Sequence, residues 1–338
     1  MINSQGVEIM TLKSRILQVF ESHRGQALSG QQLADELNVS RNSVWKAVKA
    51  LQSEGYKIHA TTNKGYALEK DNDIISEESL RANLGKEFGN IDIVAMKSTP
   101  STNAEAMTRL MNGKIKHGTL IVADEQSQGR GRMGKSFFSP KSGIYMSVCL
   151  CKSIENLSDV MIITPAAAVA VRRSIAKYTD LDAKIKWVND IYIGKKKVCG
   201  ILTQADIDFE SGKAGTFIVG IGVNFVNQDF PDDIKDKACS LFEYQPSDVT
   251  RSMIIAEIYT QLMALTQNLE DKSFMSEYKQ YSMVIDKEIT YTLSGVEKRG
   301  RVTDIEDDGG LVIIEDDGNR RKLTCGEISI RSKNNEWI

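Results

Sequence analysis

The segment Gly129 to Ser136, GRGRMGKS, combines residue types that bind anions. Its three glycines leave the backbone free to turn several N–H groups toward one ligand. Arg130, Arg132 and Lys135 add fixed positive charge. An apolar run, Thr119 to Ala123, and a polar connector precede the segment. The pattern predicts a loop that binds phosphates or carboxylates, although a solvated basic turn has a similar composition.

The same segment matches the spacing G-x-x-x-x-G-K-[ST] of a phosphate-binding P-loop. A P-loop leads directly into a helix whose amino terminus receives the phosphate. Here Pro140 and Gly143 interrupt the chain, and the run IYMSVCLC from Ile144 is typical of a strand. We therefore expect no helix after this loop and no P-loop.

Length and composition limit the class of protein. A chain of 338 residues, 41% hydrophobic and 26% charged, is typical of a soluble protein with about two or three domains. It has no apolar run of about 20 residues and no signal-peptide pattern, so we expect a cytoplasmic protein without a membrane partner. The five cysteines include no C-x-x-C pair, and four of them lie in apolar strand-like or core-like contexts, which favours buried free thiols. Three scattered histidines argue against a zinc site or a Ser-His-Asp triad.

The first 70 residues predict a winged helix-turn-helix domain. They carry nine Lys or Arg against six Asp or Glu, whereas the whole chain has a net charge of −2. Helical spacing covers Leu12 to Glu21, a capping box opens a helix at Ser29, and Ser40 caps a third helix. Trp45 falls in the apolar stripe of that third helix, and Tyr56 to Leu68 is typical of a hairpin wing. The candidate DNA contacts are Ser40, Arg41, Asn42, Ser43, Lys46, Lys49, Thr62 and Lys64.

The rest of the chain predicts two further domains, at 71–285 and 286–338. Lys70 to Ser76 is polar and indicates a linker. In 71–285 helices and adjacent strands mix as in an α+β fold, and Thr102 with Glu105 predicts a capping box. Gly220 and Gly222 interrupt an apolar strand, which indicates a close approach of other groups. From Asp286 short strands and Asp-Gly turns predict a small β-barrel or meander.

These features together resemble one family. The helix-turn-helix head, GRGRMGK, KWVND followed by KKVCGIL, and the terminal GEISIRS are similar to the motifs of the bifunctional biotin–protein ligase and biotin operon repressor family. The resemblance extends over essentially the whole chain. It implies a central mixed β-sheet with helices, like that of class II aminoacyl-tRNA synthetases and biotin ligases. It also implies a carboxyl-terminal barrel similar to the Src-homology-3 fold.

The resemblance implies a two-step reaction. The carboxylate of biotin attacks the α-phosphate of Mg²⁺-ATP, which gives biotinyl-5′-AMP and pyrophosphate. A lysine of a biotin carboxyl carrier domain then attacks the mixed anhydride. The adenylate-loaded protein is further implied to form a homodimer that binds operator DNA and represses transcription.

The motifs place the family's site residues on this sequence. The implied biotin contacts are Ser101, Thr102, Asn103, Gln126, Arg130, Gly131, Arg132 and Lys197. The implied adenylate or ATP contacts are Gly129, Lys135, Phe137, Asn189, Gly200, Asn224 and Arg331. Catalytic roles fall on Arg132 and Lys197, whose charge suits developing phosphate charge, and on Asp190, which orients or deprotonates the acceptor amine. No metal-ligating side chain is assigned.

The sequence departs from the family pattern at three positions and leaves alternatives open. Lys135 replaces a common arginine and loses bidentate geometry, Phe137 replaces a tryptophan but stays aromatic, and Val188 replaces a proline. Asp190 also suits a structural turn, and Lys197 suits a solvated basic turn. Alternative functions are a non-catalytic biotin-sensing repressor and a ligase for lipoate or octanoate.

Overall fold

The computed structural model describes residues 11–61, 64–154, 160–207, 214–226, 229–293 and 295–330. Two predicted contacts, Thr62 and Arg331, lie outside these residues. The chain divides into two compact units, Met1–Asn90 with Gln245–Ala256, and Ile91–Tyr244 with Glu257–Ile338. The predicted boundary at residue 70 lies within the first unit. No described helix has both the length and the apolar character needed to cross a membrane.

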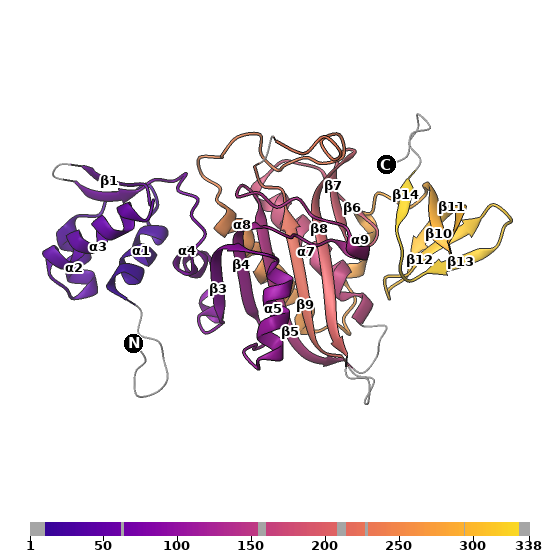
Figure 1. Cartoon of the computed structure of the whole chain (residues 1–338), viewed down its shortest axis with the longest axis horizontal. Helices are drawn as coiled ribbons and strands as arrows, with labels where there is room; N and C mark the ends of the chain where they lie inside the picture. Colours follow the sequence, from indigo (N-terminus) through magenta and orange to yellow (C-terminus); the bar gives the residue numbers. More distant parts are fainter. Residues whose placement is uncertain are drawn as a thin grey trace. The chain divides into compact units, whose positions relative to one another are not determined.

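The first unit contains the predicted helix-turn-helix with its wing (Figure 1). Its elements are α1 (Leu12–Ser22), α2 (Gly30–Leu37), α3 (Arg41–Ser53), β1 (Ile58–Thr61), β2 (Gly65–Leu68), α4 (Glu77–Asn83), the turn Lys86–Phe88 and the start of α8 (Arg251–Gln267). The Ser29 capping box is confirmed, since Gln32 N donates to Ser29 Oγ at 3.0 Å and Ser29 N donates to Gln32 Oε1 at 2.8 Å. Ser40 caps α3 by accepting from Ser43 N at 3.1 Å.

Two predictions in this unit are wrong. Trp45 does not join the apolar stripe of α3, because Val44, Val48 and Leu51 fill the core and leave Trp45 49% exposed. The stretch at Lys70–Ser76 is not a free linker. Asn72 is 1% exposed and its side-chain oxygen accepts from Lys57 N at 3.0 Å. Backbone and side-chain bonds therefore fix this stretch to the helical domain.

The second unit is built on a mixed seven-stranded sheet with the order β3-β4-β5-β9-β8-β7-β6. Strands β3 and β4 pair in parallel, and the other neighbours pair antiparallel. The strands are β3 (Ile93–Thr99), β4 (Thr119–Gln126), β5 (Ile144–Ile154), β6 (Ala183–Lys186), β7 (Asp190–Ile193), β8 (Lys196–Ile207) and β9 (Ala214–Val223). The helices are α5 (Thr102–Met111), α7 (Ile163–Tyr178), the rest of α8 and α9 (Phe274–Gln280).

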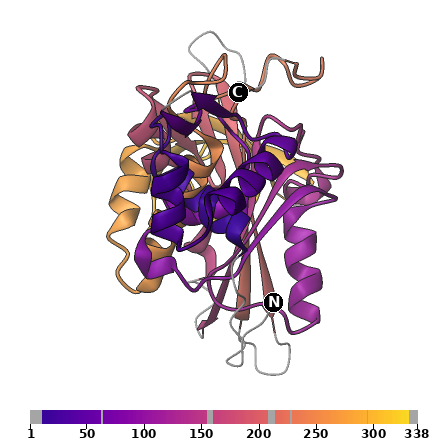
Figure 2. The same ribbon diagram turned by 90° about the vertical axis from the view of Figure 1, so that its left-hand side faces the viewer.

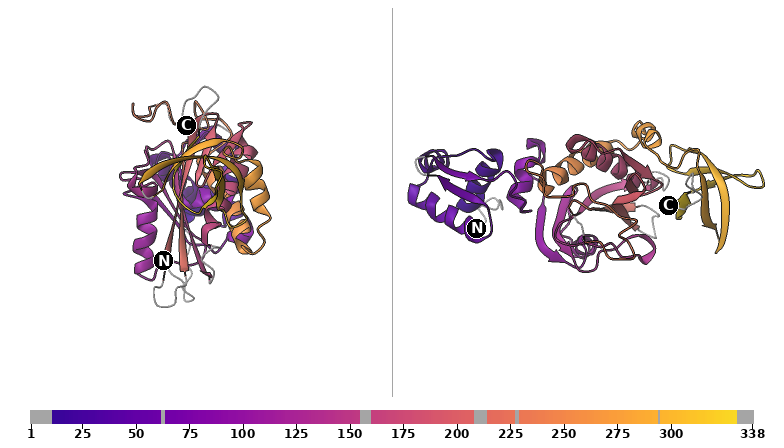
Figure 3. Two further views of the ribbon diagram at one scale, coloured as in Figure 1. Left: turned by 90° about the vertical axis from the view of Figure 1, so that its right-hand side faces the viewer. Right: turned by 90° about the horizontal axis from the view of Figure 1, so that it is seen from above.

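Helices cover both faces of this sheet. Views from the two opposite ends place α5 on one side of the strands and α8 on the other (Figure 2 and the left part of Figure 3). Leu120 to Ala123 of β4 are accordingly 0% exposed, because successive side chains point to opposite, covered faces. The sheet is therefore a rigid base, and the ends of β4 and β8 carry motif residues.

A second sheet follows near the carboxyl end. Its strands are β10 (Glu288–Leu293), β11 (Val296–Ile305), β12 (Leu311–Glu315), β13 (Arg320–Leu323) and β14 (Ile328–Ile330). They pair antiparallel in the order β13-β12-β11-β10-β14 around buried apolar residues such as Ile289, Val302 and Ile313. The predicted short strands are confirmed. Leading into β14, Gly326 and Glu327 lie beside the segment Gly129–Ser136, which is called the glycine-arginine loop from here on.

Candidate active site

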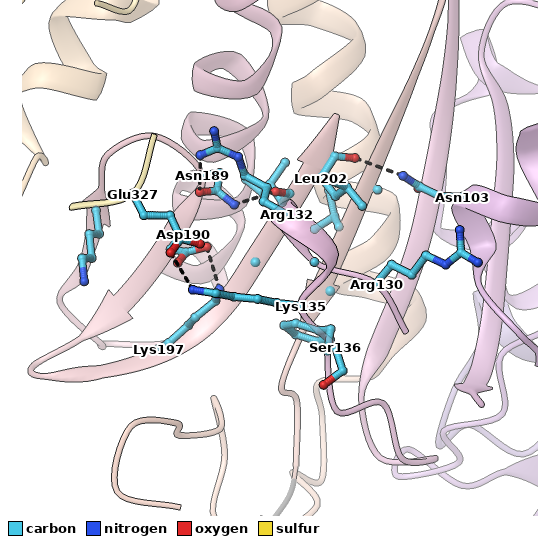
Figure 4. A pocket seen from close by; sticks show the side chains of 18 of the residues that line it. Asn103, Arg130, Arg132, Lys135, Ser136, Asn189, Asp190, Lys197, Leu202 and Glu327 are labelled. Atoms are coloured by element: carbon cyan, nitrogen blue, oxygen red, sulfur yellow. Dashed lines mark hydrogen bonds and ion pairs between the residues drawn. The ribbon is translucent and has the colours of Figure 1, made fainter. Parts of the chain in front are cut away.

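One pocket of about 360 Å³ in the second unit collects most of the predicted site residues (Figure 4). Its wall is formed by the start of α5, the end of β4, the glycine-arginine loop, the β6–β7 turn, β8, β9 and the segment before β14. The predicted residues in its lining are Ser101, Thr102, Asn103, Gln126, Arg130, Gly131, Arg132, Lys135, Phe137, Asn189, Asp190, Lys197 and Gly200. Segments far apart in sequence therefore converge on one site.

The start of α5 forms a polar wall of this pocket. The predicted Thr102–Glu105 capping box is wrong: Glu105 pairs with Arg109 at 2.7 Å. The cap comes instead from β4, where Gln126 Oε1 accepts from Thr102 N at 2.9 Å and from the Thr102 hydroxyl at 3.2 Å. Ser101 takes the N-cap position without a side-chain cap bond, and both Ser101 and Thr102 are buried. A buried helix amino terminus with hydroxyls and amides suits a small polar ligand.

Asn103 closes the inner end of the pocket, which lies against β8 and β9. Its Nδ2 donates to Leu202 O at 3.1 Å and to Gln204 Oε1 at 2.9 Å. A Cβ on Gly220 would lie 2.2 Å from Asn103 Oδ1, and a Cβ on Gly222 would lie 2.6 Å from the Phe137 ring. The predicted close approach at both glycines is confirmed, because any side chain there would occupy the space of these two groups.

The glycine-arginine loop has its own closed hydrogen-bond pattern. Gly131 N donates to Lys135 O at 2.7 Å, and Phe137 N donates to Gly129 O at 2.9 Å. A short 3-10 turn at Arg132–Gly134 is followed by extended chain and β5, so the predicted absence of a P-loop helix is confirmed. The backbone at Met133 is left-handed, with φ of 53°.

Basic side chains around the pocket are held by polar partners. Arg132 donates to Asn189 Oδ1 at 3.4 Å and to Gly326 O at 3.3 Å. Lys197 Nζ lies 2.7 Å from Asp190 Oδ1. Figure 4 shows Arg132 directed toward Asn189 and Lys197 toward Asp190, whereas Arg130 points away from that pair. The structure thus brings Arg132, Lys197 and Asp190 together at one side of the pocket.

Lys135 joins the loop to the carboxyl-terminal sheet. Its Nζ lies 2.6 Å from Glu327 Oε2, and both side chains are substantially exposed. Exposed pairs of this kind contribute about 0–1 kcal/mol to stability. The Lys135 ammonium is therefore easily available to a charged ligand.

Lys186 also lines the pocket, and the sequence interpretation did not single it out. Burial lowers the pKa of Lys186, while the Asp190 carboxylate acts in the opposite direction. A half-buried lysine beside other cations gains from an anionic ligand, because the ligand replaces lost hydration and offsets repulsion. The sequence does contain a sign of this position, because Lys186 directly precedes Trp187 in the motif KWVND.

Two predicted adenylate residues do not line the pocket. Asn224 Nδ2 donates to Cys239 O at 3.0 Å, so its side chain is used to fix the neighbouring loop. Gly129 supports the glycine-arginine loop, because a Cβ there would lie 2.3 Å from Phe137 O and 2.4 Å from Ser139 Oγ. The cysteines are free, as expected: Cys149 and Cys199 are buried, Cys151 and Cys239 are half-buried, and Cys325 is exposed.

The candidate DNA contacts lie at the start of α3 and on the wing. Arg41, Asn42, Lys46 and Lys49 are exposed on α3, together with Trp45. Ser40 and Ser43 take part in the cap of this helix, and Lys64 is exposed on the wing. The first unit thus presents basic and polar groups at the start of the second helix of a helix-turn-helix, where such domains contact DNA.

Comparison with known proteins finds separate matches for the helix-turn-helix, for the part that carries most of the pocket and for the carboxyl-terminal sheet. Residues 13–67 match an HTH domain, residues 95–224 the Biotin/lipoate A/B protein ligase family, and residues 284–331 the Biotin protein ligase C terminal domain. The chain is 33% identical to the bifunctional ligase/repressor BirA of Bacillus subtilis over 324 residues, which covers 92% of this chain and 96% of that protein. It is 25% identical to the bifunctional ligase/repressor BirA of Salmonella typhimurium, covering 91% of this chain and 94% of that protein.

A solved structure supports the same assignment. The biotin protein ligase from Aquifex aeolicus in complex with biotin and ATP matches with a TM-score of 0.60 and 27% identity, over 72% of this chain and 99% of that chain. That match concerns the ligase fold, and the matches to the two BirA proteins extend over the helix-turn-helix as well. The chain therefore belongs to the biotin/lipoate A/B protein ligase family, among its bifunctional ligase/repressors.

Proposed function

We propose that this protein activates biotin with ATP and transfers it to a lysine of a biotin carboxyl carrier domain. The observation that carries the proposal is the make-up of one pocket. Uncharged hydrogen-bonding groups of Thr102, Asn103 and Gln126 line one part, and Arg132 and Lys197 line another. The first set suits the neutral polar ring of biotin, and the second suits a carboxylate and phosphates.

In the first step a carboxylate oxygen of biotin attacks the α-phosphorus of ATP. The bond from that phosphorus to the bridging oxygen breaks, and pyrophosphate leaves with the electron pair. Such a step needs in-line positioning and cations close to the developing charge. Arg132, Lys186 and Lys197 supply this charge, and Phe137 offers its ring to the adenylate.

Mg²⁺ enters this proposal with the nucleotide. Among the described residues no three His, Cys, Asp or Glu side chains converge on a metal position. Asp190 and Glu327, two carboxylates of the pocket lining, are each paired with a lysine. This arrangement supports Mg²⁺ held chiefly by phosphate oxygens, a common mode for this ion.

In the second step the amine of the acceptor lysine attacks the carbonyl carbon of biotinyl-5′-AMP, and AMP leaves. Asp190 accepts a hydrogen bond from the incoming ammonium and takes its proton, while Lys197 holds the adenylate phosphate. The 2.7 Å contact between Asp190 and Lys197 supports this pairing of roles.

The helix-turn-helix adds a repressor function. We propose that a homodimer loaded with biotinyl-5′-AMP binds operator DNA through Arg41, Asn42, Lys46 and Lys49, with Lys64 on the wing. Two copies related by a two-fold axis match the symmetry of a palindromic site.

At the finer level of fold, we infer a class II synthetase-like central domain and a Src-homology-3-like terminal barrel.

Transfer to a carrier domain tests the enzymatic proposal. With ATP, Mg²⁺ and biotin, mass spectrometry should find one biotinyl group on the carrier domain, and none when its acceptor lysine is replaced by arginine. Asp190→Asn should slow this transfer more than it slows adenylate formation. A protein that binds biotin tightly and leaves the carrier unmodified would overturn the ligase proposal.

DNA binding is tested separately by fluorescence anisotropy of operator DNA. Biotin with ATP should raise the affinity of the wild type, and Arg41→Ala should lower it without changing carrier biotinylation. Operator affinity that ignores biotin and ATP would contradict the proposed coupling of adenylate and dimer.

A further inference from the structure

A buried serine lies behind the pocket, where it contacts both the glycine-arginine loop and Gln126. Ser139 is 6% exposed, and its hydroxyl donates to Phe137 O at 2.8 Å. Its oxygen accepts from Gln126 Nε2 at 3.0 Å. Ser139 is not among the residues that line the pocket, so any effect on a ligand must act through its neighbours.

The donor and acceptor pattern at Ser139 determines the orientation of Gln126. A carbonyl only accepts, so the single hydroxyl proton of Ser139 is used by Phe137 O, and Ser139 Oγ must then accept. It accepts from the amide nitrogen of Gln126, which leaves Gln126 Oε1 to face Thr102 N. A flipped amide would put two donors against each other at Thr102. Ser139 therefore selects the amide orientation that caps α5.

The same chain of hydrogen bonds continues to the inner end of the pocket. Ser147 is 0% exposed on β5, and its hydroxyl lies 2.8 Å from Thr102 Oγ1 and 2.7 Å from Asn103 Oδ1. Ser139, Gln126, Thr102, Ser147 and Asn103 thus form one largely buried polar cluster, in which Gln126 Oε1 accepts from Thr102 N and the single proton of Ser147 serves either Thr102 Oγ1 or Asn103 Oδ1. Buried networks of this kind rigidify the groups that they join, because each unpaired member would be costly.

We propose that Ser139 is a positioning residue for biotin. It holds the amide of Gln126 and, through it, the amino terminus of α5 in the orientation that receives the ligand. By the same hydroxyl it fixes the backbone of Phe137 at the base of the glycine-arginine loop. This inference rests on the proposed function of the pocket and adds a residue outside its lining.

The test compares Ser139→Ala with Ser174→Ala in the full chain. Ser174 is a matched control, because it is also buried, at 0% exposed, and its hydroxyl also donates to a backbone carbonyl, Ala170 O at 2.8 Å, but within α7. The measured quantities are the KM for biotin and kcat in biotin-dependent ATP–pyrophosphate exchange, and the thermal midpoint. Ser139→Cys, nearly the same size with a weaker hydrogen-bonding group, is the second variant.

Ser139→Ala should raise the KM for biotin about three- to tenfold, as expected for one lost hydrogen bond that orients a binding group, and change kcat less than twofold. Ser139→Cys should give a smaller rise, and Ser174→Ala none. A wild-type KM in Ser139→Ala, or a loss confined to kcat, would overturn the inference. If the wild type shows no biotin-dependent exchange, the proposed function fails, and this inference fails with it.

Discussion

Gly220→Ala tests the close packing of Asn103 against β9. A Cβ at position 220 would lie 2.2 Å from Asn103 Oδ1 and 2.8 Å from its Cγ, distances that non-bonded atoms do not tolerate. Asn103 is 4% exposed at the start of α5, and moving its amide away from β9 would break the hydrogen bonds that it makes to β8. The substitution should therefore displace the amide of Asn103 from the inner end of the pocket.

The magnitude follows from the bonds that this displacement breaks. Asn103 bonds Leu202 O at 3.1 Å and Gln204 Oε1 at 2.9 Å, and its Oδ1 accepts from Ser147 at 2.7 Å. Each such bond contributes about 0.5–1.5 kcal/mol net, and overpacking costs about 1–3 kcal/mol. Moving Asn103 relieves the overpacking but breaks its hydrogen bonds, so the two costs do not add in full. We therefore expect a loss of about 2–4 kcal/mol in the free energy of unfolding.

Urea denaturation and biotin titration calorimetry measure the two consequences. Gly215→Ala is the control, since it lies on the same strand and a Cβ there meets no atom within 4 Å. Gly220→Ala should lower stability by the stated amount and weaken biotin binding at least tenfold, whereas Gly215→Ala should do neither. Equal stability and equal biotin affinity in the two variants would refute the packing argument.

Three further predictions concern other parts of the chain. Burial lowers the pKa of Lys186, so kcat/KM for ATP should fall as the pH rises through that lowered pKa. Lys186→Arg should move this fall to higher pH, because arginine stays charged. An identical fall in the variant would show that the charge of Lys186 does not support the reaction. Trp45 is 49% exposed on α3, so operator DNA should change the tryptophan emission of the wild type but not of Trp45→Phe; an identical change in both would place Trp45 outside the interface. Asp73 Oδ2 accepts from Arg251 Nε at 2.7 Å, and both side chains are largely buried. Asp73→Ala should therefore lower the free energy of unfolding of the first unit, measured in urea, by about 3–5 kcal/mol. A loss below about 1 kcal/mol, the level of an exposed pair, would show that this ion pair is solvated.

Local patterns in the sequence predicted the elements and many of the site residues. The capping boxes and caps at Ser29 and Ser40 depend on neighbours within three residues, and both are present in the structure. The resemblance to the family grouped the glycine-arginine loop, the Asn189–Asp190 turn and Lys197 at one site, and the structure brings them to one pocket. Such features depend on short stretches of chain, which a single sequence displays directly.

Long-range partners were not visible in those patterns. The cap of α5 comes from Gln126 on β4, so the local Thr102–Glu105 pair was misleading. Likewise, helical spacing cannot decide whether Trp45 beside an apolar stripe turns inward, because the width of the core settles that question. Lys186 shows its perturbed pKa only once folding buries it near other charges.

The same limit applies to Asn224 and to the polar stretch at Lys70–Ser76. Asn224 lies in a motif strand, but its side chain bonds Cys239 O on a loop that spacing alone does not position. The polar stretch has the composition of a linker, yet Asn72 is buried against Lys57. In both cases a distant backbone group determines the role of the side chain.

Biotin-dependent ATP–pyrophosphate exchange tests the central claim most directly, because it reports adenylate formation in this pocket without a carrier domain or DNA. The wild type should exchange only with biotin and not with lipoate. Arg132→Ala and Lys197→Ala should each lose at least about a hundredfold in rate, the scale of one lost electrostatic contact in a transition state. Lys196→Ala is the control, since Lys196 is outside the pocket lining and donates to Lys235 O, and it should retain the wild-type rate. Exchange that proceeds without biotin, or that survives both substitutions, would contradict the account.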